Sequence, residues 1–334
     1  MDKLLSVIIL NWNGERLLKT FLPSVVESTV ADEVDVIVAD NGSSDSSLDL
    51  IRTEFPSVKV ISFDKNYGFA GGYNKAISEV DSEFVLLLNS DVETPQGWWQ
   101  PLLKFMRDNQ DVGACQPKIK SYRNRQMFEY AGAAGGLLDS LGYPYCRGRL
   151  FDFVEKDEGQ YDYAPADIAW ASGAALMVRR EAYLKVEGLD ERFFAHMEEI
   201  DLCCRMHNAG YRVCYVPESE VYHLGGASLA HGNPMKTYLN FRNNLLLLLK
   251  NLPEKKGRSV LFKRRLMDSL AFLMFVAKFD FKNAGAILKA HRDFRRMRSC
   301  YRNFPERDIL STLPGANRVI VFDRYLKGIK SYNS

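Results

Sequence analysis

The stretch Phe84-Val-Leu-Leu-Leu-Asn-Ser-Asp91 decides the fold of this chain, because five apolar residues in a row lead directly towards an acid. A short apolar run of this kind is typical of a strand that is buried on both faces of a sheet. Three other β-rich runs precede it at residues 6–10, 34–39 and 58–63, and stretches with helical spacing separate them. Strands that alternate with helices indicate βαβ units, so the sequence predicts an α/β fold with a mostly parallel central sheet.

Each of these four strands is followed by a polar or glycine-containing loop. The loops are Asn11-Trp-Asn13-Gly14, Asp40-Asn-Gly-Ser43-Ser-Asp45, Asp64-Lys-Asn66-Tyr-Gly68 and Asn89-Ser90-Asp91. In open α/β sheets, ligands bind outside the carboxyl ends of the strands. We therefore expect the four loops to line one cleft.

Composition indicates one large domain with a basic extension. The chain has 334 residues, 46% of them hydrophobic and 26% charged, which suffices for an ample core. Residues 1–234 hold 22 Lys and Arg against 35 Asp and Glu, whereas residues 235–300 hold 16 against 4. We therefore divide the chain into an acidic α/β domain at 1–234 and a basic, mainly helical extension at 235–334.

Two features of the sequence bear on the compartment. The cysteines show no metal-type CxxC spacing and are interpreted as reduced thiols. Residues 4–10 are too few for the apolar core of a signal peptide, and the apolar run at 270–277 is far short of the roughly 20 residues of a membrane-spanning helix. We expect a cytoplasmic protein without a transmembrane helix.

The rest of the chain is expected to complete the sheet and then to become helical. Residues 112–170 are less regular and are interpreted as strands and loops that cover the cleft. The elements predicted after them are a strand at 173–179, a helix from about Met197, a strand at 211–216, and helices at 238–249 and 261–278. Pro253 and Gly257 mark the break between the last two helices.

Two loops of the predicted cleft have a structural interpretation as well as a functional one. In the loop at 40–45, backbone N–H groups and short hydroxyls gather where a nucleotide would be gripped. This loop taken alone nevertheless favours the structural interpretation, in which Ser43 or Ser44 caps the next helix. The glycines of Asn66-Tyr-Gly-Phe-Ala-Gly-Gly-Tyr-Asn74 allow a backbone to approach a ligand closely. This loop matches neither the GxGxxG nor the GxxxxGK[ST] fingerprint, which argues against dehydrogenases and P-loop ATPases.

Acids and one imidazole supply the candidate chemistry. Asp91 stands at a strand end, where it suits a divalent cation that neutralises a diphosphate, or is simply a turn acid. Glu198-Glu199-Ile-Asp201 opens a predicted helix, and acids gather in first helical turns for dipole reasons alone. A histidine such as His223 is, by itself, more often an ordinary surface or core residue than a ligand. Only the combination of these groups favours the functional interpretation.

Six motifs in one order resemble a known family. They are the asparagine-rich strand end at 11–14, Asp40-Asn-Gly-Ser-Ser-Asp45, Asn66 to Asn74, Leu88-Asn-Ser-Asp91, Phe193-Phe-Ala-His-Met-Glu-Glu-Ile-Asp201, and Tyr222-His-Leu-Gly-Gly226. Over residues 4–250 the chain resembles family 2 glycosyltransferases of the GT-A fold, closest to the bacterial rhamnosyltransferase-like branch. The resemblance implies a Rossmann-like, nucleotide-sugar-binding domain.

The resemblance also implies which residues hold the donor and the metal. The nucleotide-sugar residues would be Asn11, Asn13, Asp40, Asn41, Ser43, Asn66, Gly68, Gly72, Asn74, Asn89 and Ser90. Among them, Asp40 would accept the N3–H of a uracil or thymine base. Asp91 and His223 would hold Mn²⁺ or Mg²⁺ against the diphosphate, and an imidazole favours Mn²⁺. Asn89 replaces the first acid of the family's DxD motif, which leaves one charge fewer at the metal.

Glu199 matches the position of the family's catalytic base, normally an aspartate, with Glu198 and Asp201 as neighbours that take or support the role. Such a base deprotonates the acceptor hydroxyl, which attacks the anomeric carbon from the face opposite the diphosphate and inverts it. We hypothesise that like-charge repulsion among these acids raises the pKa of the base. The resemblance further implies that Trp170 and Gly173 shape the pocket for donor and acceptor.

The predicted activity is a metal-dependent inverting transfer of a sugar, with rhamnose as one candidate, from a dTDP- or UDP-sugar in cell-surface polysaccharide synthesis. The acceptor would be a hydroxyl of a glycan or of a polyprenyl-diphosphate-linked lipid. Basic and apolar residues interleave at 261–296, a pattern suited to the inner face of the plasma membrane, although a solvated helix face would also have it. No nucleic-acid motif accompanies the charge, so no nucleic-acid partner is expected. The sequence leaves the oligomeric state open.

Two other functions remain open from sequence. A sugar nucleotidyltransferase would share the α/β nucleotide fold, but the loop at 11–14 lacks the glycine-rich, basic grip on a triphosphate that it needs. A non-catalytic scaffold that binds sugar nucleotides is conceivable because Asn89 and Glu199 depart from the family pattern.

Overall fold

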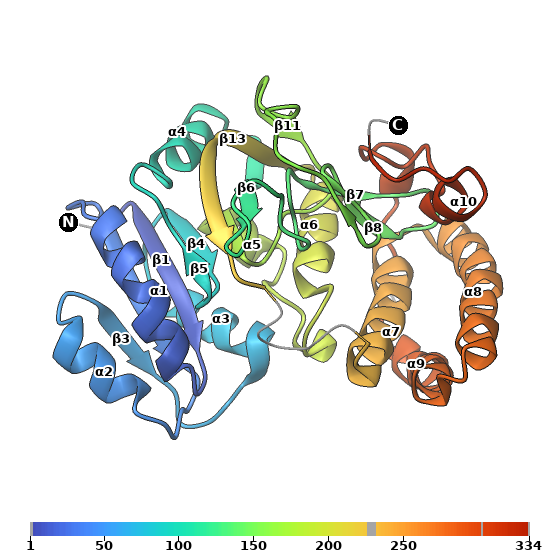
Figure 1. The fold of residues 1–334 in the computed structure, drawn as a ribbon, viewed down its shortest axis with the longest axis horizontal. Helices are drawn as coiled ribbons and strands as arrows, with labels where there is room; N and C mark the ends of the chain where they lie inside the picture. Colours follow the sequence, from blue (N-terminus) through green and yellow to red (C-terminus); the bar gives the residue numbers. More distant parts are fainter. Residues whose placement is uncertain (1–2, 226–231, 302, 333–334) are drawn as a thin grey trace.

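The computed structural model describes residues 3–225, 232–301 and 303–332. Its central sheet is built from β1 Leu5–Asn11, β2 Val34–Asp40, β3 Lys59–Ser62, β4 Phe84–Leu88, β5 Val92–Glu93, β6 Val112–Ser121, β11 Ala166–Asp167, β12 Ala175–Arg179 and β13 Arg212–His223. The strands lie in the order β11-β13-β6-β12-β4-β1-β2-β3, and β5 pairs with the end of β13 (Figure 1). The predicted α/β class with a mostly parallel sheet is confirmed.

The apolar run at 84–88 forms β4, which is fully buried near the middle of the sheet. β4 is parallel to β1, and β1 and β2 are parallel in turn, with Asn11 opposite Asp40. β12 runs antiparallel on the other side of β4. Because β1 to β4 are parallel, the loops that follow them meet at one edge of the sheet.

Helices pack on both faces of the sheet. The helices of the described residues are α1 Glu15–Ser28, α2 Ser47–Glu54, α3 Gly68–Ser78, α4 Gln100–Asp108, α5 Arg180–Lys185, α6 Glu198–Asn208, α7 Pro234–Asn251, α8 Glu254–Ala277, α9 Phe281–Met297 and α10 Ile320–Tyr325, with 3-10 turns at Glu191–Phe193, Arg298–Cys300 and Ile309–Ser311. Alternate residues of each strand face opposite sides, so the core divides in two. Residues of α1 and α4 pack on one face, and residues of α3, α6 and α7 pack on the other.

The irregular region at 112–170 differs from its prediction in one respect. Residues 112–121 form β6, which lies inside the sheet between β12 and β13 instead of covering the cleft. The remainder forms a small sheet of β7 Gly136–Leu138, β8 Pro144–Cys146, β9 Arg149–Leu150 and β10 Phe153–Val154. Lys118 is buried in β6 by ion pairs to Asp157 and Asp162, and such polar residues hide the strand from an apolar pattern.

The helical end of the chain also departs from prediction. The break falls at Leu252 and Pro253, and Gly257 lies inside α8. A further long helix, α9, was not predicted; it packs against both α7 and α8. Residues after 234 share the main core, since Leu245 to Leu248 of α7 and Phe294 of α9 belong to the same buried cluster as the sheet. Among the described residues, no helix has the length and apolar character needed to cross a bilayer.

Candidate functional site

The loops after β1 and β2 are joined by their own polar side chains. Asn11 Nδ2 donates to Asp40 Oδ1 at 2.9 Å, and Ser43 N donates to Asp40 Oδ2 at 3.0 Å. Ser43 Oγ accepts from Asn13 N at 2.9 Å. All four residues were predicted from sequence, and the structure brings them together. Ser43 is therefore a loop-bridging residue and not the cap of α2, whose N-cap is Ser46.

Asn41 ties the loops after β2 and β3 to the start of α3. Its Nδ2 donates to Asn66 Oδ1 at 3.0 Å and to Gly68 O at 2.9 Å, and its Oδ1 accepts from Tyr67 N at 2.9 Å. A Cβ on Gly72 would lie 2.6 Å from Leu10 Cδ1, so only glycine permits α3 to pack this closely against β1. Since the Asn41 amide is occupied at both ends, this side chain shapes the cleft.

Asn74 does not face this cleft as expected. Its Oδ1 accepts from Tyr183 Oη at 2.6 Å and from Leu189 N at 2.9 Å, while its Nδ2 donates to Leu189 O at 2.8 Å. The amide thereby joins α3 to the segment that leads from α5 to α6. The assignment of Asn74 to the donor site is corrected accordingly, because a side chain with three protein partners has little capacity for a ligand.

Asp91 and His223 lie side by side where β4 and β13 end. His223 Nε2 is 3.1 Å from Asp91 Oδ1, and His223 Nδ1 is 3.4 Å from Glu129 Oε2. Burial lowers the pKa of this imidazole, but the two carboxylates outweigh burial and raise it to about 10. Glu129 was not predicted from sequence; it is buried, and its Oε2 also accepts from Ala131 N at 2.5 Å.

A divalent cation fits part of this arrangement. A carboxylate and an imidazole that has lost its proton are donors that Mn²⁺ accepts, and both side chains are buried at a strand end. Asn89 and Ser90 precede Asp91 and are half-buried, and Asn89 N donates to Ala174 O at 3.0 Å. Within the described ranges, no group of three or more His, Cys, Asp or Glu side chains is arranged as a complete set of metal ligands. A metal here would need oxygens from a bound ligand such as a diphosphate.

Glu198 and Glu199 open α6, and each carboxylate leaves part of its hydrogen-bonding capacity unused. Neither Glu198 Oε2 nor Glu199 Oε2 has a hydrogen bond among the described residues, and both atoms are buried. Burial raises the pKa of Glu199 to about 7, against the lowering effect of nearby backbone N–H groups. The pKa of Glu198 is raised further, by burial first and by the charge of Glu199 second. Burial is thus the leading cause, and like-charge repulsion, which we hypothesised, is secondary.

Gly173 links Glu198 and Glu199 to the predicted metal ligands Asp91 and His223. A Cβ on Gly173 would lie 3.8 Å from Glu199 Cβ, so the two residues are neighbours. The next residue, Ala174, accepts the hydrogen bond from Asn89 N at the end of β4. Glu199 and Asp91 therefore approach the same end of the sheet from α6 and from β4. His223 reaches that end from β13.

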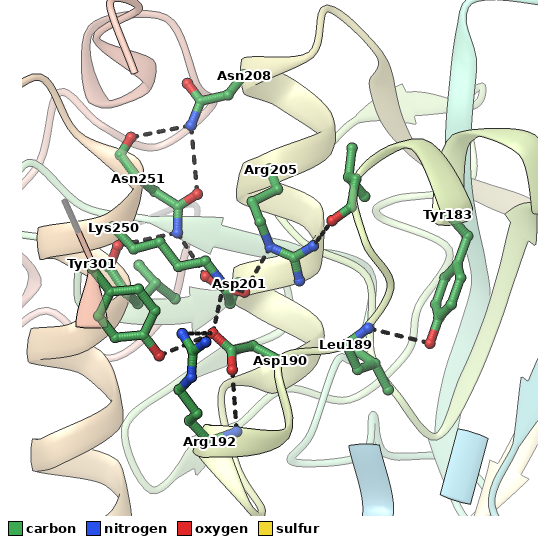
Figure 2. A network of polar contacts seen from close by, with 12 residues as sticks. Tyr183, Leu189, Asp190, Arg192, Asp201, Arg205, Asn208, Lys250, Asn251 and Tyr301 are labelled. Carbon is green, nitrogen blue, oxygen red and sulfur yellow. Dashed lines mark hydrogen bonds and ion pairs between the residues drawn. The ribbon is translucent and has the colours of Figure 1, made fainter. Parts of the chain in front are cut away.

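Asp201 differs from the other two acids of its motif because its carboxylate is fully occupied. Arg205 Nε donates to Oδ2 at 2.8 Å, Lys250 Nζ donates to the same oxygen at 2.9 Å, and Asn251 Nδ2 donates to Oδ1 at 2.8 Å. Lys250 also reaches Asp190 Oδ2 at 2.8 Å, as Figure 2 shows. Asp201 holds α6 against α7, so we remove it from the candidate bases.

Trp170 is part of the core and not of an open pocket. Its side chain is buried, its Nε1 donates to Leu137 O at 2.9 Å, and its ring lies directly against Gly136. Trp170 was expected to shape the pocket for donor and acceptor, but its exposure of 4% leaves the ring no free face. Gly173, three residues later, keeps its place at the site through Glu199.

Sequence comparison agrees with this geometry. The profile of "Glycosyl transferase family 2" matches residues 6–183. The chain is 29% identical over 240 residues to the "N-acetylglucosaminyl-diphospho-decaprenol L-rhamnosyltransferase" of Mycobacterium tuberculosis, covering 67% of this chain and 76% of that protein.

Structural comparison confirms the expected GT-A fold, at low sequence identity. The structure of S. aureus TarS 1–349 in complex with UDP-GlcNAc has a TM-score of 0.58 at 18% identity and covers 88% of this chain and 80% of its own. That of GalNAc-T7 with UDP, GalNAc and Mn²⁺ has a TM-score of 0.56 at 17% identity and covers 82% and 58%. On the profile match and this fold together, the chain belongs to glycosyl transferase family 2 and is a glycosyltransferase.

Proposed function

We propose that this enzyme transfers a sugar from a UDP- or dTDP-sugar to a hydroxyl of a polyprenyl-diphosphate-linked glycan, with L-rhamnose as the first sugar to test. The name of the M. tuberculosis relative supports both the sugar and the lipid-linked acceptor. The UDP-GlcNAc in the TarS structure supports a nucleotide-sugar donor. In this proposal residues 1–234 form the catalytic domain and residues 235–334 a helical extension that supports it.

The observation that carries the proposal is the buried Oε2 of Glu199, which has no hydrogen-bond partner among the described residues. Its pKa of about 7 lets it exist as a carboxylate near neutral pH and still take up a proton readily. It lies against Gly173, next to the end of β4 where Asp91 and His223 meet. A base and a diphosphate-binding corner at one edge of a sheet are what a sugar transfer requires.

In the proposed reaction, Glu199 removes the proton from the acceptor hydroxyl as the oxygen attacks the anomeric carbon. The bond between that carbon and the diphosphate oxygen breaks, and the departing nucleoside diphosphate takes the electron pair. Attack from the opposite face inverts the anomeric configuration. Burial and the charge of Glu199 raise the pKa of the neighbouring Glu198 above its ordinary value, which favours the protonated form of Glu198 beside the base.

Asp91 and His223 would hold the cation, and Glu129 would fix the orientation of the imidazole. A bound Mn²⁺ or Mg²⁺ would stabilise the charge on the departing diphosphate electrostatically. The Mn²⁺ in the GalNAc-T7 structure supports a divalent ion in this fold. The Asp40 corner, formed by Asn11, Asn13, Asp40 and Ser43, would hold the base and ribose of the donor. Asn11 Oδ1 is buried without a partner among the described residues and is therefore an acceptor available there.

The proposal is tested by nucleoside diphosphate release from a panel of nucleotide sugars with a short-chain polyprenyl-diphosphate glycan as acceptor. We expect turnover with one donor, dependence on added Mn²⁺ or Mg²⁺, and a product of inverted configuration by NMR. Turnover that is unchanged in Glu199→Gln would refute the assigned base. Equal rates without any divalent ion would refute the assigned metal site.

We further propose that α8 and α9 rest on an anionic membrane, where a lipid-linked acceptor is found. Residues 254–298 hold 13 Lys and Arg against 4 Asp and Glu. Large apolar side chains of the same segment are exposed, among them Leu273, Phe279, Phe281 and Leu288. Arginines line a groove of about 990 Å³ between the two helices. Such a surface is attracted by charge and inserts apolar side chains.

Vesicle flotation tests the membrane proposal. The protein should float with vesicles of phosphatidylglycerol and not with phosphatidylcholine alone, and 0.5 M salt should weaken the association by about tenfold or more. Phe279→Ser with Phe281→Ser should reduce flotation while donor hydrolysis in solution is unchanged. Equal flotation with both lipids, or none with either, would refute it.

A further inference from the structure

The segment that delivers Glu198 and Glu199 has an unfavourable backbone. Phe194 has φ 67° and ψ −58°, and Ala195 N donates to Phe193 O at 2.8 Å, which together make a tight γ-turn of the rare, strained kind. His196 and Met197 follow with φ of 64° and 74°. None of these residues is glycine, so the loop needs outside contacts to keep this shape.

Asn243 of α7 supplies those contacts. Its side chain is completely buried, and its Nδ2 donates to Phe193 O at 2.9 Å, to Ala195 O at 2.9 Å and to His196 O at 2.7 Å. Its Oδ1 accepts from Arg242 Nε at 2.8 Å. A guanidinium only donates, so this bond fixes which end of the amide faces the loop.

The loop leads without a break into the acids. Met197 is the N-cap of α6, and its carbonyl accepts the first helical bond from Asp201 N at 2.8 Å. Further along α6, Asp201 is bound by Lys250 and Asn251 of the same α7, as Figure 2 shows. Two points on α7 therefore set the place of α6, one before Glu198 and Glu199 and one after them.

We infer that Asn243 is a positioning residue for the base: it holds the strained loop at 193–197 in the shape that places the Glu199 carboxylate. The inference rests on the proposed role of Glu199. It predicts an effect on the chemical step with little effect on donor binding, because the hydrogen bonds of Asn243 go to the acid loop and those of Asp40 to the loops after β1 and β2. If Asn243 served stability alone, its replacement would not affect the chemical step and donor binding differently.

The neighbouring Asn244 is a matched control. It is also a buried asparagine of α7 whose amide donates to a backbone carbonyl, Gly142 O at 2.7 Å, and accepts from an arginine, Arg264. Its partners belong to the small second sheet and to α8, and not to the acid loop. Asn243→Asp and Asn244→Asp therefore make the same chemical change at adjacent positions.

The experiment compares these two variants in steady-state kinetics with thermal melting. Loss of the donor in Asn243→Asp should displace the loop and lower kcat by about 100-fold, with KM for the nucleotide sugar and Kd for UDP within about twofold. Asn244→Asp should keep kcat within about threefold even if its Tm falls equally. Asn243→Ser, which retains one donor, should fall between wild type and Asn243→Asp and covers the case in which the aspartate variant does not fold.

Three outcomes would overturn the inference: equal kcat losses in the two aspartate variants, a loss in Asn243→Asp that lies in the donor KM, or full activity in Asn243→Ser. Glu199→Gln is measured in parallel to separate the two proposals. If Glu199→Gln is active, the assigned base is wrong and the positioning role falls with it. If Glu199→Gln is inactive and Asn243→Asp matches Asn244→Asp, only the positioning role is wrong.

Discussion

The Asp40 corner of the site and the Glu199 corner, formed by Glu198 and Glu199, are built in opposite ways. Around Asp40, the polar side chains of neighbouring loops are bound to one another, as in the contacts of Asn11, Ser43 and Asn13. Around Glu199, one oxygen of each of two neighbouring carboxylates is buried without a hydrogen-bond partner among the described residues, behind a strained loop that α7 holds. The first corner is a rigid binding surface already formed by its own hydrogen bonds.

The difference concerns what each corner must do. A binding corner gains from being preorganised, since no ordering cost is then left for the ligand. A base must instead be kept out of ion pairs, because a paired carboxylate has a depressed pKa and a weak hold on a proton. Asp201 of the same motif differs in its pairing: Arg205 and Lys250 bind its carboxylate, whereas Glu198 and Glu199 each keep an oxygen unpaired.

The largest expected effect breaks one corner without the other. Glu199→Gln keeps the shape of the side chain and removes its basicity, so kcat should fall by about 10²–10⁴-fold. The affinity for UDP, which we propose is set at the Asp40 corner, should stay unchanged in isothermal titration calorimetry. A variant that loses UDP affinity along with kcat would show that the two corners are not independent. Circular dichroism and melting curves verify that the variant is folded.

A smaller effect is expected at Glu129, which contacts the proposed metal ligand His223. Glu129→Gln leaves a neutral amide beside His223 Nδ1, 3.4 Å from the original carboxylate oxygen, and so weakens the hold on the imidazole. Loss of such an outer partner typically lowers metal affinity by about 10–100-fold. Mn²⁺ titration followed by electron paramagnetic resonance measures this directly. Glu220→Gln, at the Lys120 ion pair, is the matched control and should bind Mn²⁺ like wild type.

Sequence patterns predicted the first corner better than the second, for a physical reason. The apolar pattern of β1 to β4 is a local property of the sequence, and parallel pairing brings the loops after these strands to one edge of the sheet. Local sequence therefore suffices to assign Asn11, Asp40 and Ser43 to one corner. Their hydrogen-bond partners lie in the same or the next loop of that edge.

The second corner depends on contacts that no local pattern encodes. Asn243 acts on carbonyls about fifty residues earlier in the chain, and Glu129 reaches His223 across the sheet. The one local sign of Asn243 is a pair of asparagines within the leucine-rich run of α7, where polar side chains need a buried partner. Trp170 was misassigned because an aromatic near a motif gives no information about the side on which its ring packs.

A pH experiment sharpens the comparison through stability. Burial holds the pKa of Glu199 at about 7 in the fold, against 4.5 as its ordinary value. The folded state therefore binds more protons between these values, and the stability from the protonated form is present below pH 4.5 and is lost as pH rises through 7. Glu199→Gln, which is neutral at every pH, should raise Tm at pH 8 and leave it nearly unchanged at pH 4.5.

The same titration of Glu199 should also affect catalysis, where ionisation raises activity although it lowers stability. The base works only when ionised, so wild-type kcat should fall as pH decreases through about 7, tenfold for each further unit. A Tm difference between Glu199→Gln and wild type that is the same at both pH values would contradict the buried, unpaired state of this carboxylate. The comparison between the corners would then lose its electrostatic basis.

The smallest effect on activity is expected from Trp170→Phe. The indole donates to Leu137 O and is 4% exposed, so the substitution removes a buried hydrogen bond and part of the core volume. The free energy of unfolding should fall by about 1–3 kcal/mol in urea denaturation. KM for donor and acceptor should stay within about twofold, since the ring has no free face for a sugar. A rise in acceptor KM without loss of stability would return Trp170 to the pocket, and it would mean that the sheet at Gly136 opens when the acceptor binds.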